Sequence, residues 1–161
     1  MKVFKMILLG VFILYLQLII APYFTIYSII PNFFIAYFAF AGIRINAKSL
    51  FPIAFFLGLA LDVMYPPLLG LNSIAFIIIV YFVCKFQTSI NKQRFIIVSL
   101  SILFLNFLYY IIFYLYHLFA SQNLESFFLY LLLSIFYNTF VSILIIYILS
   151  LSEKIKISIN V

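Results

Sequence analysis

Apolar runs fill almost the entire chain, and only short polar stretches separate them. Of the 161 residues, 69% are hydrophobic and 7% are charged, a balance that cannot wrap one small core in a polar surface. No polar segment reaches the roughly 50 residues of even a small soluble domain. The sequence therefore predicts an all-α, polytopic membrane protein with a single integral membrane domain over residues 1–161.

Six apolar runs predict six transmembrane helices, at roughly residues 3–21, 26–43, 50–65, 70–86, 95–120 and 127–151. The last two exceed the ~20 residues that a bilayer requires, whereas the second is short. Counted from Pro31, which suits a helix start, the second run would rise only about 20 Å at 1.5 Å per residue. It must therefore begin earlier with a kink, lie beside thinned bilayer, or be partly re-entrant.

The nine Lys and Arg residues occupy alternate flanks of these six runs. The other three flanks contain no basic residue and instead hold Asp62 and Glu125. Because cytoplasmic loops are enriched in Lys and Arg, we expect both termini in the cytoplasm and the turn after Asp62 on the outer side. Basic residues dispersed in this way indicate topology and contact with anionic lipid headgroups, and they do not indicate nucleic-acid binding.

Residues that could carry out chemistry are scarce. Cys84 has no second cysteine to pair with, and His117 stands alone near the predicted outer end of the fifth run. The sequence contains no His/Cys/carboxylate cluster for a metal and no glycine-rich phosphate loop. We therefore expect no metal, no cofactor and no enzymatic activity.

Uncharged polar side chains occur within the apolar runs, where hydrocarbon offers them no partner. They are Gln17, Asn106, Asn138 and Thr139. Such groups would either hydrogen-bond between helices, at about 0.6–2 kcal/mol each, or Asn106 and Asn138 would line a substrate pocket together with Tyr109. The sequence leaves both interpretations open.

Asp62 is the only acidic residue among the first 124 positions, and it lies at the end of an apolar run. Inserting this side chain into hydrocarbon would cost roughly 2.5–3.5 kcal/mol of free energy on insertion scales. Asp62 therefore needs a partner, water or a nearby interface. Gly58 lies four residues earlier on the same helix face and would let a neighbouring backbone approach. Asp62 would either cap the helix end by accepting N–H groups, such as those of residues 69–71, or contact a partner or a solute.

At this stretch the chain resembles the rod shape-determining protein MreD family. The resemblance rests on a chain of this length with six apolar runs, on Pro31-Asn32 opening the second run, on the segment 58–62, and on the segment 67–72 leading into the fourth run. It implies a partner-binding or structural role for the residues that carry the motif, namely Pro31, Gly58, Asp62, Gly70 and Asn72.

The resemblance also implies a function. It suggests a non-enzymatic subunit of the elongation (rod shape) machinery in the bacterial inner membrane, bound to the single-pass protein MreC and linked through it to MreB, RodA and a penicillin-binding transpeptidase. The family is also similar in fold to the substrate-binding S subunits of energy-coupling-factor transporters. An S-type subunit for a small solute such as a vitamin is therefore the alternative, although the few polar groups expected on the outer side favour a protein or lipid contact.

Overall fold

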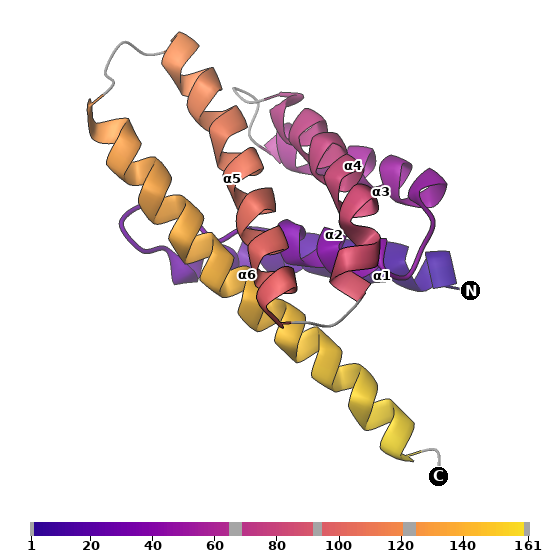
Figure 1. Ribbon diagram of the computed structural model, residues 1–161. Helices are drawn as coiled ribbons and strands as arrows, with labels where there is room; N and C mark the ends of the chain where they lie inside the picture. Colours follow the sequence, from indigo (N-terminus) through magenta and orange to yellow (C-terminus); the bar gives the residue numbers. More distant parts are fainter. Residues whose placement is uncertain (1, 65–68, 92–94, 121–124, 160–161) are drawn as a thin grey trace.

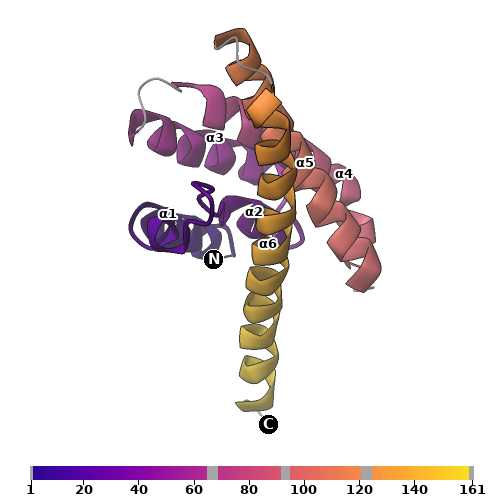
Figure 2. The ribbon, with the colours of Figure 1, turned by 90° about the vertical axis from the view of Figure 1, so that its left-hand side faces the viewer.

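The protein is all-helical in the parts of the chain that the computed structural model describes, which are residues 2–64, 69–91, 95–120 and 125–159 (Figure 1). The elements in chain order are α1 (Lys2–Ile19), the short 3₁₀ helix η1 (Ala21–Phe24), α2 (Phe34–Gly42), α3 (Ala47–Met64), α4 (Leu71–Asn91), α5 (Phe95–Ala120) and α6 (Glu125–Ile159). In both ribbon views α6 is the longest helix and carries the C-terminus away from the rest of the molecule (Figures 1 and 2).

Helix α2 is short and lies in the centre of the protein. It has nine residues, and every one of them is buried. At 1.5 Å per residue α2 is about 14 Å long, roughly half of the hydrocarbon thickness. It contacts α4 and α6 most extensively and also α1, α3 and α5, so it is surrounded by protein rather than by lipid.

The helix predicted at 26–43 is wrong in its first half, because helical structure begins only at Phe34. The preceding residues form a tight reversal instead, in which Ile26 and Ile29 exchange backbone hydrogen bonds of 3.1 and 2.8 Å. Tyr27 and Ser28, at the tip of this reversal, both have left-handed backbone angles that interrupt a helix.

Other helix ends differ from expectation by smaller amounts. α4 continues to Asn91, beyond the predicted end at 86, and α6 covers Glu125–Ile159 rather than 127–151. In both cases most of the added residues are polar or charged, and none of them is a proline or glycine that would end a helix. Hydrophobicity marks where a helix meets lipid, whereas the helix itself continues until the backbone is interrupted.

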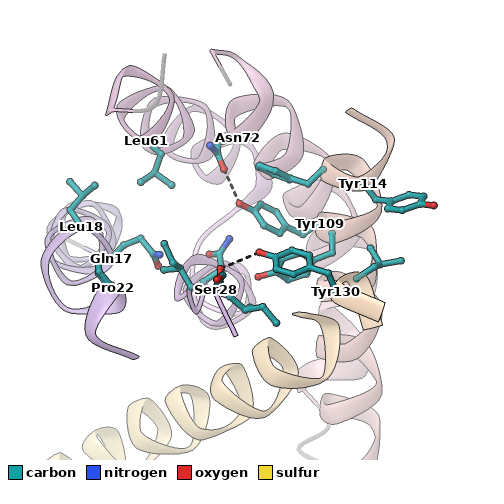
Figure 3. A pocket seen from close by; sticks show the side chains of 15 residues that line it. Gln17, Leu18, Pro22, Ser28, Leu61, Asn72, Tyr109, Tyr114 and Tyr130 are labelled. Carbon is teal, nitrogen blue, oxygen red and sulfur yellow. Dashed lines mark hydrogen bonds between the residues drawn. The ribbon is translucent and has the colours of Figure 1, made fainter. Parts of the chain in front are cut away.

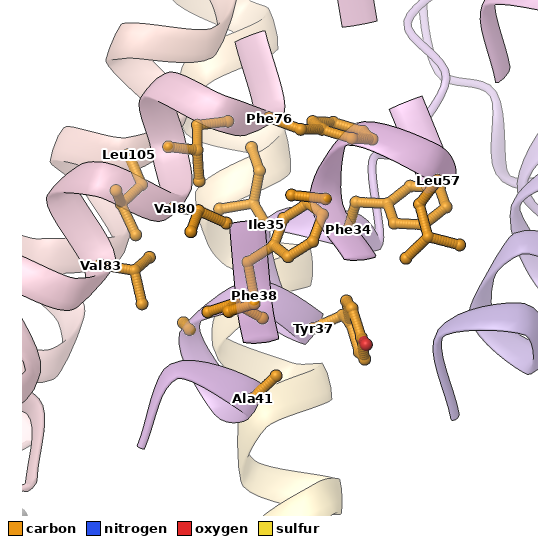
Figure 4. Close-up of a cluster of buried hydrophobic side chains, with 14 of the residues drawn as sticks. Phe34, Ile35, Tyr37, Phe38, Ala41, Leu57, Phe76, Val80, Val83 and Leu105 are labelled. Atoms are coloured by element: carbon orange, nitrogen blue, oxygen red, sulfur yellow. The ribbon is translucent and has the colours of Figure 1, made fainter. Parts of the chain in front are cut away.

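Aromatic side chains from α2 form the middle of the core (Figure 4). The rings of Phe34 and Phe38 each lie 5.0 Å from the ring of Phe76 on α4, measured between centroids. Tyr37 lies on another side of α2 and donates a hydrogen bond of 2.9 Å to the backbone oxygen of Met6 in α1. This one helix thus ties α1 to α4.

The outer surface is apolar around the described part of the molecule. Large exposed hydrophobic side chains occur on every long helix, for example Phe12, Phe56, Tyr81, Phe107 and Phe136. Four helical segments are long and apolar enough to cross a membrane, namely Lys2–Ile19, Ala47–Met64, Val98–Tyr116 and Phe128–Leu149, and Leu71–Phe86 is a shorter apolar helix. An apolar surface of this extent requires a lipid or protein environment.

Candidate functional site

Asp62 lies in the last turn of α3, fully buried, and its carboxylate accepts four hydrogen bonds from the first turn of α4. Its Oδ1 accepts the backbone N–H and the side-chain amide of Asn72, both at 3.0 Å. Its Oδ2 accepts the backbone N–H of Ser73 at 3.0 Å and the Ser73 hydroxyl at 2.7 Å. A buried carboxylate with both oxygens occupied in this way is stabilised without a countercharge.

The carboxylate acts as the N-cap of α4 from another helix. The first α4 hydrogen bond runs from the N–H of Ile74 to the oxygen of Gly70, so Gly70 occupies the capping position. An N-cap side chain normally accepts the N–H groups two and three residues later, but Gly70 has no side chain. Asp62 accepts those two N–H groups instead, and its negative charge lies at the positive end of the helix dipole.

This geometry matches the capping interpretation of Asp62, with a shift in the residues that donate. The expected donors were the amides of residues 69–71, whereas the observed donors are Asn72 and Ser73. The capping rule applied to Gly70 would have identified both residues. Ser73 was not singled out from the sequence, although its hydroxyl makes the shortest of the four contacts.

Gly58 brings the backbones of α3 and α4 into contact. A Cβ atom at this position would lie 2.5 Å from the Cα of Ser73 and 2.7 Å from its backbone nitrogen. Only glycine fits at such a distance, since backbone atoms cannot move aside as a flexible side chain can. The prediction of a close backbone approach at Gly58 is therefore confirmed, and this approach places Asp62 within reach of the α4 amides.

Gly70 is required for conformational rather than packing reasons. Its φ angle is +91°, a value that residues with a Cβ rarely adopt, and among the described residues other than its chain neighbours no atom lies within 4 Å of the position its Cβ would take. The turn into α4 depends on this glycine.

Asn72 extends the network to a third helix. Its Oδ1 accepts a hydrogen bond of 2.9 Å from the hydroxyl of Tyr109 on α5 (Figure 3). Its amide nitrogen is already engaged with Asp62, so both ends of the Asn72 side chain are used. The Tyr109 ring packs over Phe76 with 6.1 Å between centroids. Asp62, Asn72 and Tyr109 thus connect α3, α4 and α5 through buried polar groups.

Gln17 and Asn138 hold the segment that enters α2. The Gln17 amide donates to the oxygen of Pro31 and accepts the N–H of Phe33, both at 2.8 Å. Asn138, on α6, accepts the N–H of Asn32 at 2.6 Å. The Asn32 side chain in turn accepts the N–H of Phe34 at 2.9 Å. These backbone groups would otherwise be buried without a partner, which explains two of the polar residues within the apolar runs.

Asn106 makes a different kind of contact. It is fully buried on α5 and donates back to the oxygen of Ile102 in its own helix, and its side-chain oxygen has no hydrogen-bond partner among the residues described. The hydroxyl of Thr139 is likewise without a partner. Asn106 and Asn138 are therefore not joined in one site, and Asn138 alone links separate elements.

A cavity of about 300 Å³ lies beside the Asp62–Asn72–Tyr109 chain (Figure 3). Residues of α1, α3, α4, α5 and α6 and of the segment between α1 and α2 line it: Gln17, Leu18, Pro22, Ser28, Ile29, Ile30, Asn32, Leu61, Asn72, Tyr109, Tyr110, Phe113, Tyr114, Tyr130 and Leu131. Tyr109 lines this cavity, whereas Asn106 and Asn138 are not among its lining residues.

The remaining candidate residues add no chemical site among the residues described. Cys84 is a half-buried free thiol in α4, and no group of three His, Cys, Asp or Glu residues is placed to hold a metal there. His117 lies on α5 and Glu125 begins α6, but their side chains are outside the described part of the structure. The described site is therefore a set of contacts between helices next to a cavity.

Comparison with known protein families shows which family this chain belongs to. A family described as rod shape-determining protein MreD matches residues 1–154. The chain belongs to the MreD family. MreD proteins are membrane proteins with a role in rod shape determination, so this chain is a multi-pass membrane protein of that class. No curated protein and no solved structure matches the chain, so its similarity in fold to transporter S subunits stays a prediction.

Proposed function

We propose that this MreD protein is a non-enzymatic subunit of the bacterial elongation machinery that binds MreC and helps to organise side-wall peptidoglycan synthesis. The match to the MreD family over residues 1–154 is the observation that carries the proposal. Through MreC the protein would be linked to MreB, RodA and a penicillin-binding transpeptidase. The protein would lie in the inner membrane. Its single membrane domain would cross the bilayer six times and contact lipids.

The buried polar groups support a role without catalysis. Asp62, the acidic residue in the described core, uses both carboxylate oxygens to hold α4. A catalytic acid or nucleophile needs an oxygen or nitrogen free to reach a substrate. We therefore assign the motif residues Pro31, Gly58, Asp62, Gly70 and Asn72 a structural role, in which they fix the shape that a partner binds.

The proposed topology places both termini in the cytoplasm. One cavity is lined by residues near the C-terminal ends of α1 and α3, the N-terminal end of α4, the C-terminal half of α5 and the N-terminal part of α6. These ends therefore lie together, as expected if α1, α3 and α5 run outward and α4 and α6 run inward. Residues 20–33 would then fold back at the outer side, and α2 would complete the inward pass toward the basic loop that contains Arg44 and Lys48.

The cavity is the one feature that favours the alternative, an S-type transporter subunit. It lies at the proposed outer end, partly covered by the segment between α1 and α2. However, none of the described residues that line it is charged, and several of its polar side chains are already hydrogen-bonded within the protein. A polar vitamin would require free donors and acceptors at this place.

Depletion in a rod-shaped host, combined with purification in mild detergent, tests the proposal. We expect depleted cells to become round and wide, with loss of side-wall insertion of peptidoglycan and no rescue by added vitamins. The purified protein should recover MreC. Rod-shaped depleted cells that lose uptake of one solute, together with recovery of paired ATPases, would instead establish the transporter subunit.

A further inference from the structure

One wall of the cavity beside Tyr109 is fixed by hydrogen bonds from α6. This wall is the hairpin of residues 25–30, whose central residues Tyr27 and Ser28 have φ angles of 48° and 63°. Left-handed angles at a tyrosine and a serine are unfavourable and persist only where the surroundings fix them. The hydroxyls of Tyr130 and Tyr137 on α6 donate to the oxygens of Ser28, at 3.3 Å, and Phe24, at 2.6 Å, and so hold the hairpin and the residues before it in place.

The opening of the cavity continues into an apolar surface. Ile30 and Tyr130 line the cavity and are themselves exposed, so the lining reaches the surface of the protein beside the hairpin and α6. On either side of this opening lie further exposed apolar residues, Ile26 on the hairpin and Leu133 on α6. Tyr23, next to the hairpin, is 85% exposed, and Tyr27 at its tip is 82% exposed, as is typical of side chains at a membrane interface.

The interior of the cavity offers few free polar groups. The Gln17 amide is engaged at both ends with the backbone, and the Asn72 amide is engaged at both ends with Asp62 and Tyr109. The Tyr130 hydroxyl donates to the hairpin. The other lining residues are mainly leucine, isoleucine and aromatic residues, and they also include Asn32 and the tyrosines Tyr110 and Tyr114. A ligand would therefore gain mostly apolar contact here.

The size of the cavity restricts the occupant further. A volume of 300 Å³ corresponds to about ten water molecules at ~30 Å³ each. Each water molecule needs two to four polar partners, whereas most of the lining surface is apolar. One turn of a partner helix, with a diameter of about 10–12 Å and a pitch of about 5.4 Å, occupies roughly 500 Å³ and is therefore too large for the cavity. A flexible hydrocarbon chain is narrow enough, and the surrounding bilayer supplies such chains at high concentration.

We infer that this cavity is a binding site for one hydrocarbon chain of a membrane lipid, which enters between the hairpin 25–30 and α6. The inference goes beyond the role in cell shape and does not depend on the identity of any protein partner. The bound hydrocarbon chain would contact the ring of Tyr109, whose hydroxyl belongs to the hydrogen-bond network of Asp62, Asn72 and Tyr109. Lipid occupancy would thus be sensed by the same residues that hold α3, α4 and α5 together.

Photo-crosslinking tests this site in the full-length protein reconstituted in nanodiscs. One sample contains phosphatidylglycerol with a photoreactive group within its acyl chain, and a parallel sample contains a photoreactive polyprenyl phosphate. After illumination, labelled peptides are mapped by mass spectrometry. The two probes share the hydrocarbon chemistry and distinguish a linear acyl chain from a branched isoprenoid chain as its source.

Matched variants separate cavity binding from general lipid contact. Leu131→Trp fills the cavity, whereas Leu132→Trp places the same side chain on the neighbouring exposed position of α6. Leu18→Trp and Ile19→Trp form a second pair on α1. We expect label at Phe113 and its neighbours to fall about tenfold in each cavity-filling variant, a loss of about 1.4 kcal/mol in binding, and to stay unchanged in each control.

Specific outcomes contradict the inference. Label from both probes spread evenly over exposed apolar residues, with no enrichment at the lining residues, would mean that the cavity holds no chain. The same conclusion follows if a cavity-filling variant elutes as a folded protein and retains full labelling at Phe113. If one probe labels the lining residues preferentially and this labelling is lost in both cavity-filling variants, the site is supported. The probe that gives the labelling then identifies the type of lipid chain that binds.

Discussion

Replacing Asp62 with asparagine tests whether the carboxylate holds α3 and α4 together. The substitution keeps the size of the side chain but replaces one of two acceptor oxygens with an NH₂ donor. If the remaining oxygen keeps the two Asn72 donors, the new NH₂ group faces the Ser73 N–H, which can only donate. The Ser73 hydroxyl can rotate and accept, so one of four hydrogen bonds is lost and one is rearranged.

The expected cost follows from these contacts. A hydrogen bond to a charged group contributes about 1.5–3 kcal/mol, and loss of the negative charge at the α4 N-terminus removes about 0.3–1 kcal/mol more. We therefore expect a free energy of unfolding that is about 2–4 kcal/mol lower. For a chain of this length that corresponds to a fall in Tm of roughly 5–15 °C in detergent.

Thermal unfolding of purified variants provides the measurement. Ser73→Ala is the informative comparison, because it removes only the hydroxyl donor and should lower the Tm by less than Asp62→Asn. Val63→Asn, on an exposed position of α3, controls for adding an amide to this helix. An Asp62→Asn protein with the Tm of the wild type, in the same assay where Ser73→Ala is destabilised, would refute the capping argument.

Gly58→Leu should impair accumulation or assembly more than Asp62→Asn does, because it places atoms where the α4 backbone lies and overpacking of this kind costs about 1–3 kcal/mol or more. Immunoblots of membranes test this, and normal accumulation and assembly of the leucine variant would exclude close packing at that position. In a protein from which Cys84 has been removed, single cysteines at Asn91 and Ser158 should react only with reagents added on the cytoplasmic side, and one at Gln122 only from outside. Cytoplasmic labelling at Gln122 would contradict the six-pass topology.

The sequence predicts helix contacts well where one residue type has one physical use. Gly58 and Asp62, four residues apart, indicated the close approach, and the cap was one of the two interpretations that the sequence left open for Asp62. The donors were less certain, because the sequence after Pro66 and Pro67 does not by itself show which residue begins α4. Treating Gly70 as the capping position resolves that register.

The second apolar run shows what the sequence could not specify. Its hydrophobicity predicts burial but does not say whether lipid or protein surrounds it, and here protein does. The reversal at Tyr27 and Ser28 has no glycine or asparagine to mark it, since tertiary hydrogen bonds from Tyr130 and Tyr137 fix this segment instead. The position of the cavity depends on that reversal and was beyond sequence reasoning for the same reason.

The contact between Asn32 and Asn138 has a consequence for biogenesis. The two residues are separated by 106 positions. The backbone N–H of Asn32, at the entrance to α2, therefore has no final partner until almost the whole chain has been synthesised. A nine-residue apolar helix cannot span the bilayer while it waits. We therefore expect the N-terminal third to reach its final packing only after α6 has been synthesised and inserted.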